Sequence, residues 1–295
     1  MRLLLVLSTA TMLIGYSAFG QVKEVPIAAR FISPEDRSYI ESLPYGVAQA
    51  PTPRAVLQQS VEFVIPELII GGEWTSTIKL TNKSAKTMPA TNVFFEDNLG
   101  NPMKATFQTT VGNVLTEAGF SFSLVPGGIV EATFIGGTST QFGHAIIDIC
   151  GTAGVCSSAG LYGEVTLRNR NSTRPDFESI FPLEQPTDLQ YMLLDHRNGL
   201  ATILYLVNSN TTSTSVSLEF YNTSNQLIAK TTGVLKTFES QILSVNSLLP
   251  ATVGLQGTLV IRGQNNAGFA LVTATGLRIN SSNSFTPMRA FVPSR

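Results

Sequence analysis

An internal repeat constrains the fold of this chain more than any other feature, because two similar stretches of sequence must adopt similar structures. The segment EWTSTIKLTN (Glu73–Asn82) aligns with GLATILYLVN (Gly199–Asn208). The next segment, NVFFEDNLGNPMKA (Asn92–Ala105), aligns with SLEFYNTSNQLIAK (Ser217–Lys230). Further on, GHAIIDI resembles GTLVIRG in the same order along the chain. This conserved order indicates a tandem duplication of a unit of about 105–120 residues.

Each repeat unit has the sequence pattern of short, half-buried β-strands. In WTSTIKLTN, every second residue from Trp74 to Leu80 is expected on the inner side of a strand. Glycine, proline and asparagine separate such segments, and no convincing amphipathic helix occurs within the repeats. We therefore predict an all-β protein with two tandem immunoglobulin-like antiparallel β-sandwich domains, at residues 62–184 and 185–295. A β-barrel is the main alternative.

The first twenty residues predict a cleaved signal peptide. Arg2 precedes a short apolar run, Leu3–Ile14, and Ala18-Phe19-Gly20 places small residues before a cut at Gln21. A membrane anchor is the competing interpretation, but a span needs about 20 apolar residues and this run is shorter. We expect export, so that the protein is secreted or held in the cell envelope, periplasmic or extracellular, with no membrane span after cleavage.

Residues 21–61 are predicted to form a short helix followed by a proline-containing linker. Ser33 is a suitable N-cap and Pro34 suits the first helical position, whereas Pro44 ends the helix. No function is assigned to this segment.

The two cysteines, Cys150 and Cys156, are expected to form a disulfide. A metal site and a free thiol pair are the alternatives, but an exported protein meets an oxidising compartment, and the spacing is not that of a CxxC motif. HAIIDIC and LYGEVTLRN are expected to be neighbouring antiparallel strands, with the bridge at the base of the loop between them.

Two aligned positions of the repeat are expected to have structural roles. Trp74 aligns with Leu200, which favours core packing over a ligand-stacking role for this single tryptophan. Asn82 aligns with Asn208, and the expected role of both is to hold a turn by local hydrogen bonds.

A search for catalytic or metal-binding patterns identifies no catalytic, cofactor-binding or metal-ligating residue. His144 and His196 lack a nucleophile motif, and we expect each to be a surface or strand-edge residue. Glu96 and Asp97 are adjacent on an expected strand, so they predict a turn and not an acid–base pair. DNLGN at the same turn lacks the spacing of a calcium-binding loop, although a weak calcium site stays an alternative.

Charge narrows the range of partners. Charged residues make up 13% of the chain and the formal net charge is −1, without a basic patch. Nucleic acid is therefore not an expected partner. The expected partner is an unknown protein or an extracellular polymer.

The opening Gly71-Gly72-x-Trp74, continued through Leu80 to Asn82 and followed by Asp97-x-x-Gly-x-Pro102, resembles a group of uncharacterised exported bacterial proteins with tandem immunoglobulin-like β-sandwiches. The resemblance implies a fold and an exported location. It implies no catalytic residue.

Three functional hypotheses follow from the sequence. The first is an exported, non-catalytic protein with a structural or protein-interaction role in the envelope or outside the cell. The second is a carbohydrate-binding protein that uses loop aromatics such as Tyr162, Phe142 and Tyr221. The third, an enzyme, would need His144 or His196 to meet a carboxylate in a cleft.

Overall fold

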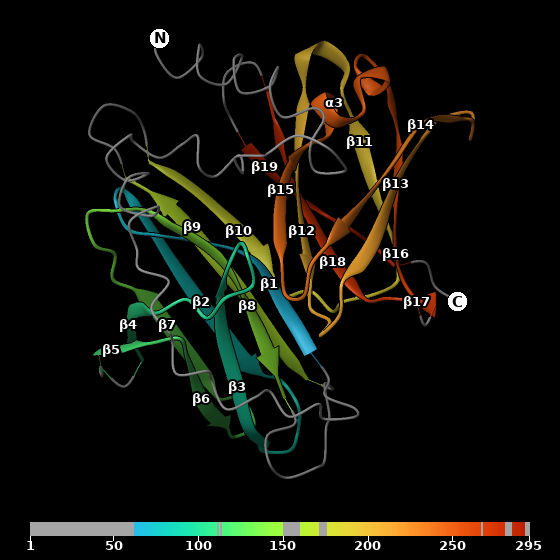
Figure 1. The fold of residues 1–295 in the computed structure, drawn as a ribbon. Helices are drawn as coiled ribbons and strands as arrows, with labels where there is room; N and C mark the ends of the chain where they lie inside the picture. Colours follow the sequence, from blue (N-terminus) through green and yellow to red (C-terminus); the bar gives the residue numbers. More distant parts are fainter. Residues whose placement is uncertain are drawn as a thin grey trace. The chain divides into compact units, whose positions relative to one another are not determined.

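The computed structural model describes residues 62–110, 112, 114–149, 160–170, 176–266, 268–280 and 285–292. The described chain consists almost entirely of antiparallel β-strands, which confirms the all-β prediction (Figure 1). The contacts within the chain divide it into two compact units, and the boundary in the sequence lies between Gln185 and Pro186. We call the described residues up to Gln185 the first sandwich and those from Pro186 the second sandwich. The predictions for residues 1–61, and the predicted disulfide of Cys150 and Cys156, lie outside the described residues.

The first sandwich contains two antiparallel sheets. Its strands are β1 (Glu62–Ile70), β2 (Trp74–Asn82), β3 (Met88–Asp97), β4 (Ala105–Thr109), β5 (Val114–Glu117), β6 (Gly119–Leu124), β7 (Ile129–Phe134), β8 (Gln141–Asp148), β9 (Leu161–Asn169) and β10 (Phe177–Pro182). One sheet has the order β1-β8-β3-β6 and the other has the order β10-β9-β2-β7-β4-β5.

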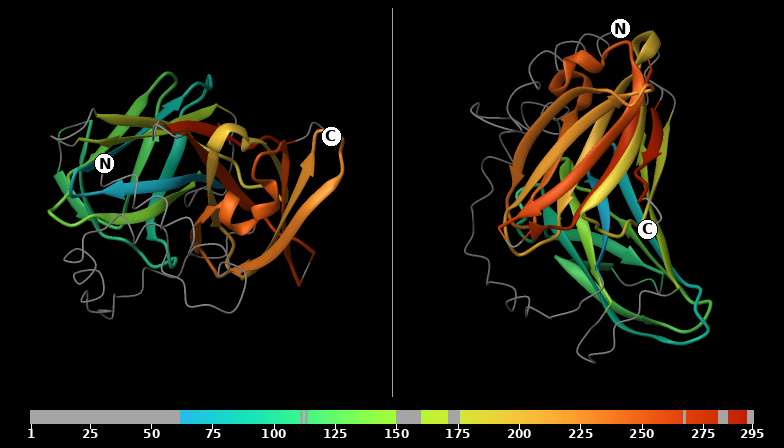
Figure 2. Two further views of the ribbon diagram at one scale, coloured as in Figure 1. Left: turned by 90° about the horizontal axis from the view of Figure 1, so that it is seen from above. Right: turned by 90° about the vertical axis from the view of Figure 1, so that its right-hand side faces the viewer.

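The second sandwich also contains two antiparallel sheets. Its elements are β11 (Leu189–Asp195), η3 (Arg197–Gly199), β12 (Ala201–Asn208), β13 (Thr214–Asn222), β14 (Leu227–Leu235), β15 (Ser240–Ser244), α3 (Val245–Leu248), η4 (Pro250–Thr252), β16 (Gln256–Asn265), β17 (Gly268–Phe269), β18 (Val272–Ile279) and β19 (Phe285–Arg289). One sheet has the order β11-β16-β13-β14, with β17 paired to β16, and the other has the order β15-β12-β18-β19 (Figure 2).

The two sandwiches share most of their strand order. The series β1-β8-β3 corresponds to β11-β16-β13, and the series β10-β9-β2-β7 corresponds to β19-β18-β12-β15. The repeat segments found in the sequence occupy equivalent strands, since β2 and β12 contain the first pair of aligned segments and β3 and β13 contain the start of the second. The common order supports the interpretation of the repeat as a duplication.

The chain departs from this shared order after β3. Here only an isolated bridge joins Glu96 to Pro102, and Met103 donates a backbone hydrogen bond to Phe95. The chain then enters the other sheet as β4, and β6 takes the place beside β3. In the second sandwich the corresponding hairpin is complete, because β14 pairs with β13 along its length.

The prediction that HAIIDIC and LYGEVTLRN are neighbouring antiparallel strands is wrong. β8 pairs with β1 and β3, whereas β9 pairs with β10 and β2 in the opposite sheet. Strands in both sheets have the same alternating pattern, so the pattern alone does not distinguish a hairpin from a connection between sheets.

Aromatic side chains fill the core of the first sandwich. The ring centroids of Phe95 and Phe107 are 5.4 Å apart and those of Phe95 and Phe134 are 4.9 Å apart, both with edge-to-face geometry. Because Phe95 belongs to β3 and the other two rings belong to β4 and β7, these contacts join the two sheets. Such pairs are each worth about 0.5–1.5 kcal/mol beyond the burial of their surface.

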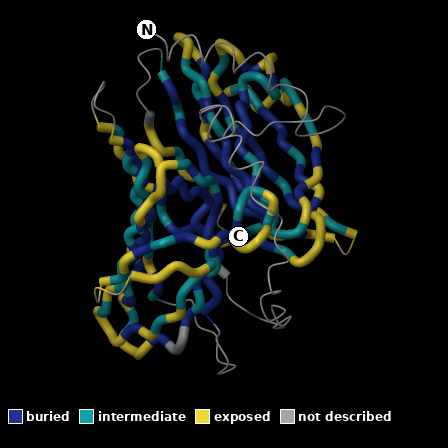
Figure 3. Tube along the Cα trace, turned by 60° about the vertical axis from the view of Figure 1, so that its left-hand side comes forward, coloured by how far each residue is buried: buried dark blue, intermediate teal, exposed yellow. Residues whose placement is uncertain are grey.

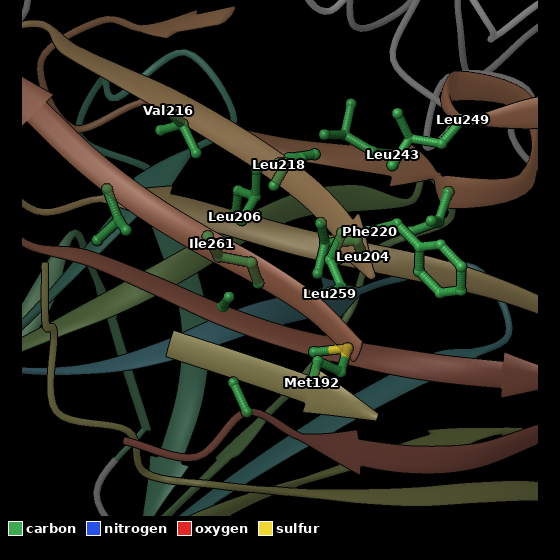
Figure 4. Packing of buried hydrophobic residues seen from close by; sticks show 14 of the residues in the cluster. Met192, Leu204, Leu206, Val216, Leu218, Phe220, Leu243, Leu249, Leu259 and Ile261 are labelled. Atoms are coloured by element: carbon green, nitrogen blue, oxygen red, sulfur yellow. The ribbon is translucent and has the colours of Figure 1, made fainter. Parts of the chain in front are cut away.

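Aliphatic side chains dominate the core of the second sandwich (Figure 4). Leu204 and Leu206 of β12 meet Leu218 and Phe220 of β13 between the sheets, and all four are fully buried. Figure 3 shows that the strands are mostly buried, whereas many of the turns are exposed. Among the described residues, no helix is long and apolar enough to cross a membrane.

A buried asparagine fixes the corner after β2. Asn82 is inaccessible to solvent, and its Nδ2 donates to the carbonyl oxygens of Lys86 (2.8 Å) and Leu124 (2.9 Å). Its Oδ1 accepts hydrogen bonds from the backbone N–H of Ser84 (2.9 Å) and from the hydroxyl of the same residue (2.7 Å). The side chain thus replaces backbone partners that the turning chain lacks.

The repeat-equivalent asparagine does the same after β12. Asn208 is inaccessible to solvent and donates to the carbonyl oxygens of Thr212 (2.9 Å) and Lys236 (2.7 Å). Its Oδ1 accepts from the backbone N–H of Asn210 (3.1 Å) and from the hydroxyl of Thr214 (3.0 Å). The prediction that both asparagines hold turns is therefore confirmed.

Candidate functional site

Both ring nitrogens of His196 make hydrogen bonds in the second sandwich. Its Nδ1 lies 2.9 Å from the hydroxyl of Thr252, and its Nε2 lies 3.0 Å from the hydroxyl of Thr202. Because the Thr252 hydroxyl donates to the carbonyl oxygen of Leu249 (2.8 Å), it accepts from Nδ1–H, and Nε2 then accepts from Thr202. The imidazole ring is also stacked on Phe220, with an interplanar angle of 6°.

The prediction that His196 is a surface or strand-edge residue is wrong, because only 1% of the residue is exposed. Burial lowers the pKa of His196 to about 4, and a hydrogen bond with the backbone of Thr252 and the charge of Asp195 oppose that shift only in part. The ring is neutral at pH 7. Its two nitrogens bind the hydroxyls of Thr252 and Thr202. These contacts stabilise the fold.

His144 of β8 is also buried, so the same prediction is wrong for this residue. It is inaccessible to solvent, and its Nε2 lies 3.1 Å from Oε2 of Glu96 on the neighbouring strand β3. In the second sandwich, Tyr221 and Thr258 form the equivalent cross-strand pair. The first sandwich therefore replaces a neutral pair with a histidine–carboxylate pair at this position.

Glu67 is a buried acid that the sequence analysis did not identify. It follows Pro66 in β1, where the register with β8 shifts between Ile65 and Leu68, so these two bulge residues lie opposite His144. Only 1% of Glu67 is exposed, and its Oε1 has no hydrogen-bond partner among the described residues. Burial raises the pKa of Glu67 well above its usual value. The signal in the sequence was a single acid within the apolar run FVIPELII.

These titratable residues do not form a metal centre. Within the described ranges, no group of three or more His, Cys, Asp and Glu side chains is arranged to hold a metal ion. The expected turn at Asp97 is confirmed, since its Oδ1 accepts from two backbone N–H groups, including that of Asn101 at 2.8 Å. Asn222 makes the same contact with Gln226 at 3.0 Å in the second sandwich. The carboxylate suggested for a weak calcium loop is thus engaged within its own turn.

Trp74 packs at the rim of the first core, as predicted. It begins β2 on the same side as the buried Ile78 and Leu80, and its half-buried ring meets Phe177 edge-on with centroids 5.9 Å apart. The turn before it requires glycine, because Gly71 has φ +88° and a Cβ there would lie 2.1 Å from a backbone oxygen.

The aromatic residues considered for carbohydrate binding do not form a common platform. Tyr162 is exposed on β9, with the ammonium of Lys83 4.3 Å from its ring centroid. Phe142 lies on β8 in the opposite sheet. Tyr221 belongs to the second sandwich, where its hydroxyl donates to Glu219 (3.0 Å).

Glu219 is the centre of an ion network on the outer face of the β11-β16-β13-β14 sheet. Lys230 of β14 donates to its Oε1 at 2.7 Å, and Arg262 of β16 lies 3.9 Å from its Oε2. The hydrogen bond from Lys230 is the main cause that lowers the pKa of Glu219. The charge of Lys230 is therefore paired with an acid of the same sheet.

A shallow groove lies between β11 and β19, the edge strands on one side of the second sandwich. Its volume is about 250 Å³, and Leu193, Met288 and Phe291 line it together with Arg278. Typical small-molecule sites are deeper and have volumes of about 300–1,000 Å³. The groove does not by itself identify a ligand.

Several sheet edges expose apolar side chains, and β5 and β14 are two of them. β5 ends the larger sheet of the first sandwich, and all four of its residues are exposed, including Val114 (57%) and Leu115 (37%). β14 ends one sheet of the second sandwich and exposes Leu227 (51%) and Val234 (57%). Unpaired strand edges of this kind can pair with another chain.

No protein-family model matches the chain, and no curated protein compared with it matches either. Function is therefore inferred from the residues of the chain itself.

Proposed function

We propose that this chain is an exported, non-catalytic β-sandwich protein that acts through contacts with other proteins, in a structural or interaction role in the envelope or outside the cell. The observation that carries the proposal is the exposure of four apolar side chains on two open sheet edges, β5 and β14. A strand edge offers backbone donors and acceptors to an extended partner, and neighbouring side chains give specificity.

The surroundings of the histidines support a non-catalytic role. A general base must reach the proton that it removes from a substrate. Both rings are buried: His196 holds two threonine hydroxyls, and His144 contacts Glu96 on the neighbouring strand. These contacts are those of groups that stabilise a fold.

The first test is capture of cross-linked partners. Mature protein, residues 21–295, is incubated with envelope extract, cross-linked and analysed by mass spectrometry. We expect cross-links to one protein at β5 or β14 that are lost in Leu115→Lys or Val234→Lys. Val253→Lys is a matched control, because Val253 is equally exposed (60%) but lies outside the strands. Capture that is insensitive to both edge variants would contradict the proposal.

The carbohydrate-binding alternative needs a separate arm. The same protein is mixed with insoluble polysaccharides beside Trp74→Leu and Tyr162→Ala variants. We expect no specific retention, because Tyr162, Phe142 and Tyr221 lie on three different sheets. Sugar-specific retention that either variant abolishes would replace a protein partner with a polysaccharide.

Export is tested by the mature N-terminus. Expression of the full chain in a bacterial host should give an exported product that begins at Gln21. A product that keeps residues 1–20 and stays in the cytoplasm would contradict this part of the proposal.

A further inference from the structure

The groove of the second sandwich lies where the edge strands β11 and β19 separate. A bridge joins Tyr191 of β11 to Phe291, just after β19, through backbone hydrogen bonds of 2.9 and 2.8 Å. The described backbone forms no other pair between these two strands. The first sandwich has the same bridge, since Val64 of β1 pairs with Glu184 after β10. The two sandwiches thus share this closure, and they differ in what lies beside it.

Arg278 of β18 stands where the first sandwich has a core leucine. Arg278 pairs with Thr202 of β12 on one side and with Thr286 of β19 on the other. The equivalent residue is Leu167 of β9, because Leu167 pairs with Ser76, and the repeat aligns Ser76 with Thr202. Leu167 is only 1% exposed, whereas Arg278 is partly exposed.

The neighbours of Arg278 on the adjacent edge strand differ in the same direction. Ser179 of β10 is buried, but its equivalent on β19, Thr286, is exposed. Phe181 of β10 is fully buried, but its equivalent Met288 is only partly buried. The second sandwich is therefore open at a place where the first is packed, and the groove occupies that place.

The guanidinium of Arg278 has donors available for a ligand. It forms no hydrogen bond or ion pair with the described residues, and it lines both the groove and an adjoining hollow of about 190 Å³. Asp195 is close enough to interact with the charge of Arg278, but both of its oxygens bind Arg197, at 2.8 and 2.7 Å. No acid is among the described residues that line the groove. A planar guanidinium in such a place matches a carboxylate, which can accept two parallel hydrogen bonds from it.

We propose that the groove between β11 and β19 binds a small organic acid, whose carboxylate accepts hydrogen bonds from Arg278 and whose apolar body lies against Met288 and Phe291. A neutral apolar molecule would cover the donors of Arg278 without replacing their water, which is unfavourable. An inorganic anion would leave the apolar side chains without a contact. The acid therefore has to carry both parts.

This site is separate from the strand edges of the proposed function. β11 and β14 lie at opposite edges of one sheet, and β5 belongs to the first sandwich. A result against the groove would leave the proposed partner contacts at β5 and β14 as they stand, and the reverse also holds.

The test is a titration with hydrocinnamate, a carboxylate with a phenyl body, at pH 7. Mature protein, residues 21–295, is isotope-labelled and followed by NMR, including the side-chain Nε–H signal of Arg278. We expect saturable shifts at this signal with a millimolar Kd, because the groove is shallow. Hydrocinnamamide has the same body without the charge, and it should bind at least tenfold more weakly.

Arg278→Leu is the main variant, because it introduces the residue that the first sandwich has at the equivalent position and should therefore fold. It should weaken hydrocinnamate binding roughly tenfold and leave the amide unchanged. Arg278→Lys keeps the charge but loses the planar pair of donors, so its effect should be smaller than that of leucine. Circular dichroism should show that both variants are folded.

Arg170→Leu is the matched control, because it removes an exposed arginine from the first sandwich. It should leave hydrocinnamate binding unchanged. Three results would each overturn the proposal: equal binding of the acid and the amide, an equal loss in Arg278→Leu and Arg170→Leu, or no change in the Arg278 signal up to the solubility limit of the acid.

Discussion

His196 links the stability of the second sandwich to pH. Its pKa is about 4 in the folded chain, against an ordinary value of 6.5. Between these values the unfolded chain binds more protons than the folded chain, so the free energy of unfolding falls as the pH is lowered from 6.5 to 4. The full effect is about 3 kcal/mol for a ring that is only 1% exposed.

His196→Gln should remove that pH dependence, because glutamine has a donor and an acceptor but does not titrate. We expect lower stability than wild type at pH 7 and a much flatter profile between pH 4 and 6.5. Urea denaturation at half-unit pH steps measures both properties. An unchanged slope in the variant would show that other groups cause the acid sensitivity.

Glu67 has the opposite linkage in the first sandwich. Burial raises its pKa above the ordinary value of 4.5, so the folded chain keeps a proton that the unfolded chain releases. Stability is then greatest below pH 4.5 and is lost as the pH rises toward the folded pKa. Glu67→Gln should abolish this dependence, since the amide does not titrate.

Glu67→Met goes further because it also removes the buried oxygen that lacks a partner. An unsatisfied buried polar group costs about 1–3 kcal/mol. We expect Glu67→Met to stabilise the first sandwich by a similar amount at pH 8 in thermal denaturation. A loss of stability would indicate that the carboxyl group is needed in the folded protein.

At the scale of the structural element, Asn82 and Asn208 should be equally important in the two sandwiches. Each is inaccessible to solvent and bonds at least two backbone carbonyl oxygens after the equivalent strand. Alanine at either position removes these hydrogen bonds from the corner, at a cost of roughly 2–4 kcal/mol. Asn→Asp at the same positions keeps the acceptor but loses both donors, so it should also destabilise. Chemical denaturation of the four variants tests this equivalence.

A small effect at one asparagine and a large effect at the other would indicate that only one corner depends on its side chain. The neighbouring Lys83→Ala serves as the control, because Lys83 is exposed and its substitution leaves the Asn82 hydrogen bonds in place.

The strands themselves were predictable because their signals are local. Alternation from Trp74 to Leu80 identified β2. The partners of each strand were not predictable, because β8 and β9 have the alternation of a hairpin although they lie in opposite sheets. The burial of His196 and His144 was missed for the same reason, since residues distant in sequence, such as Thr252 and Glu96, provide their contacts.

At the scale of the whole molecule, each sandwich has its own core. Phenylalanine rings join the sheets of the first, and a cluster that includes Leu204, Leu218 and Phe220 joins those of the second. Units with separate cores can unfold independently of each other. We therefore predict two thermal transitions in calorimetry of the full chain.

The opposite linkages of Glu67 and His196 allow these transitions to be assigned. Raising the pH from 4 to 6.5 should raise the midpoint of the transition that His196→Gln alters, by roughly 10 °C for a domain of this size. Raising the pH above 4.5 should lower the midpoint of the transition that Glu67→Gln alters. Because the two groups lie in different units, each variant should change one transition and leave the other in place. A single cooperative transition at every pH, moved as a whole by both variants, would mean that the two sandwiches unfold as one unit.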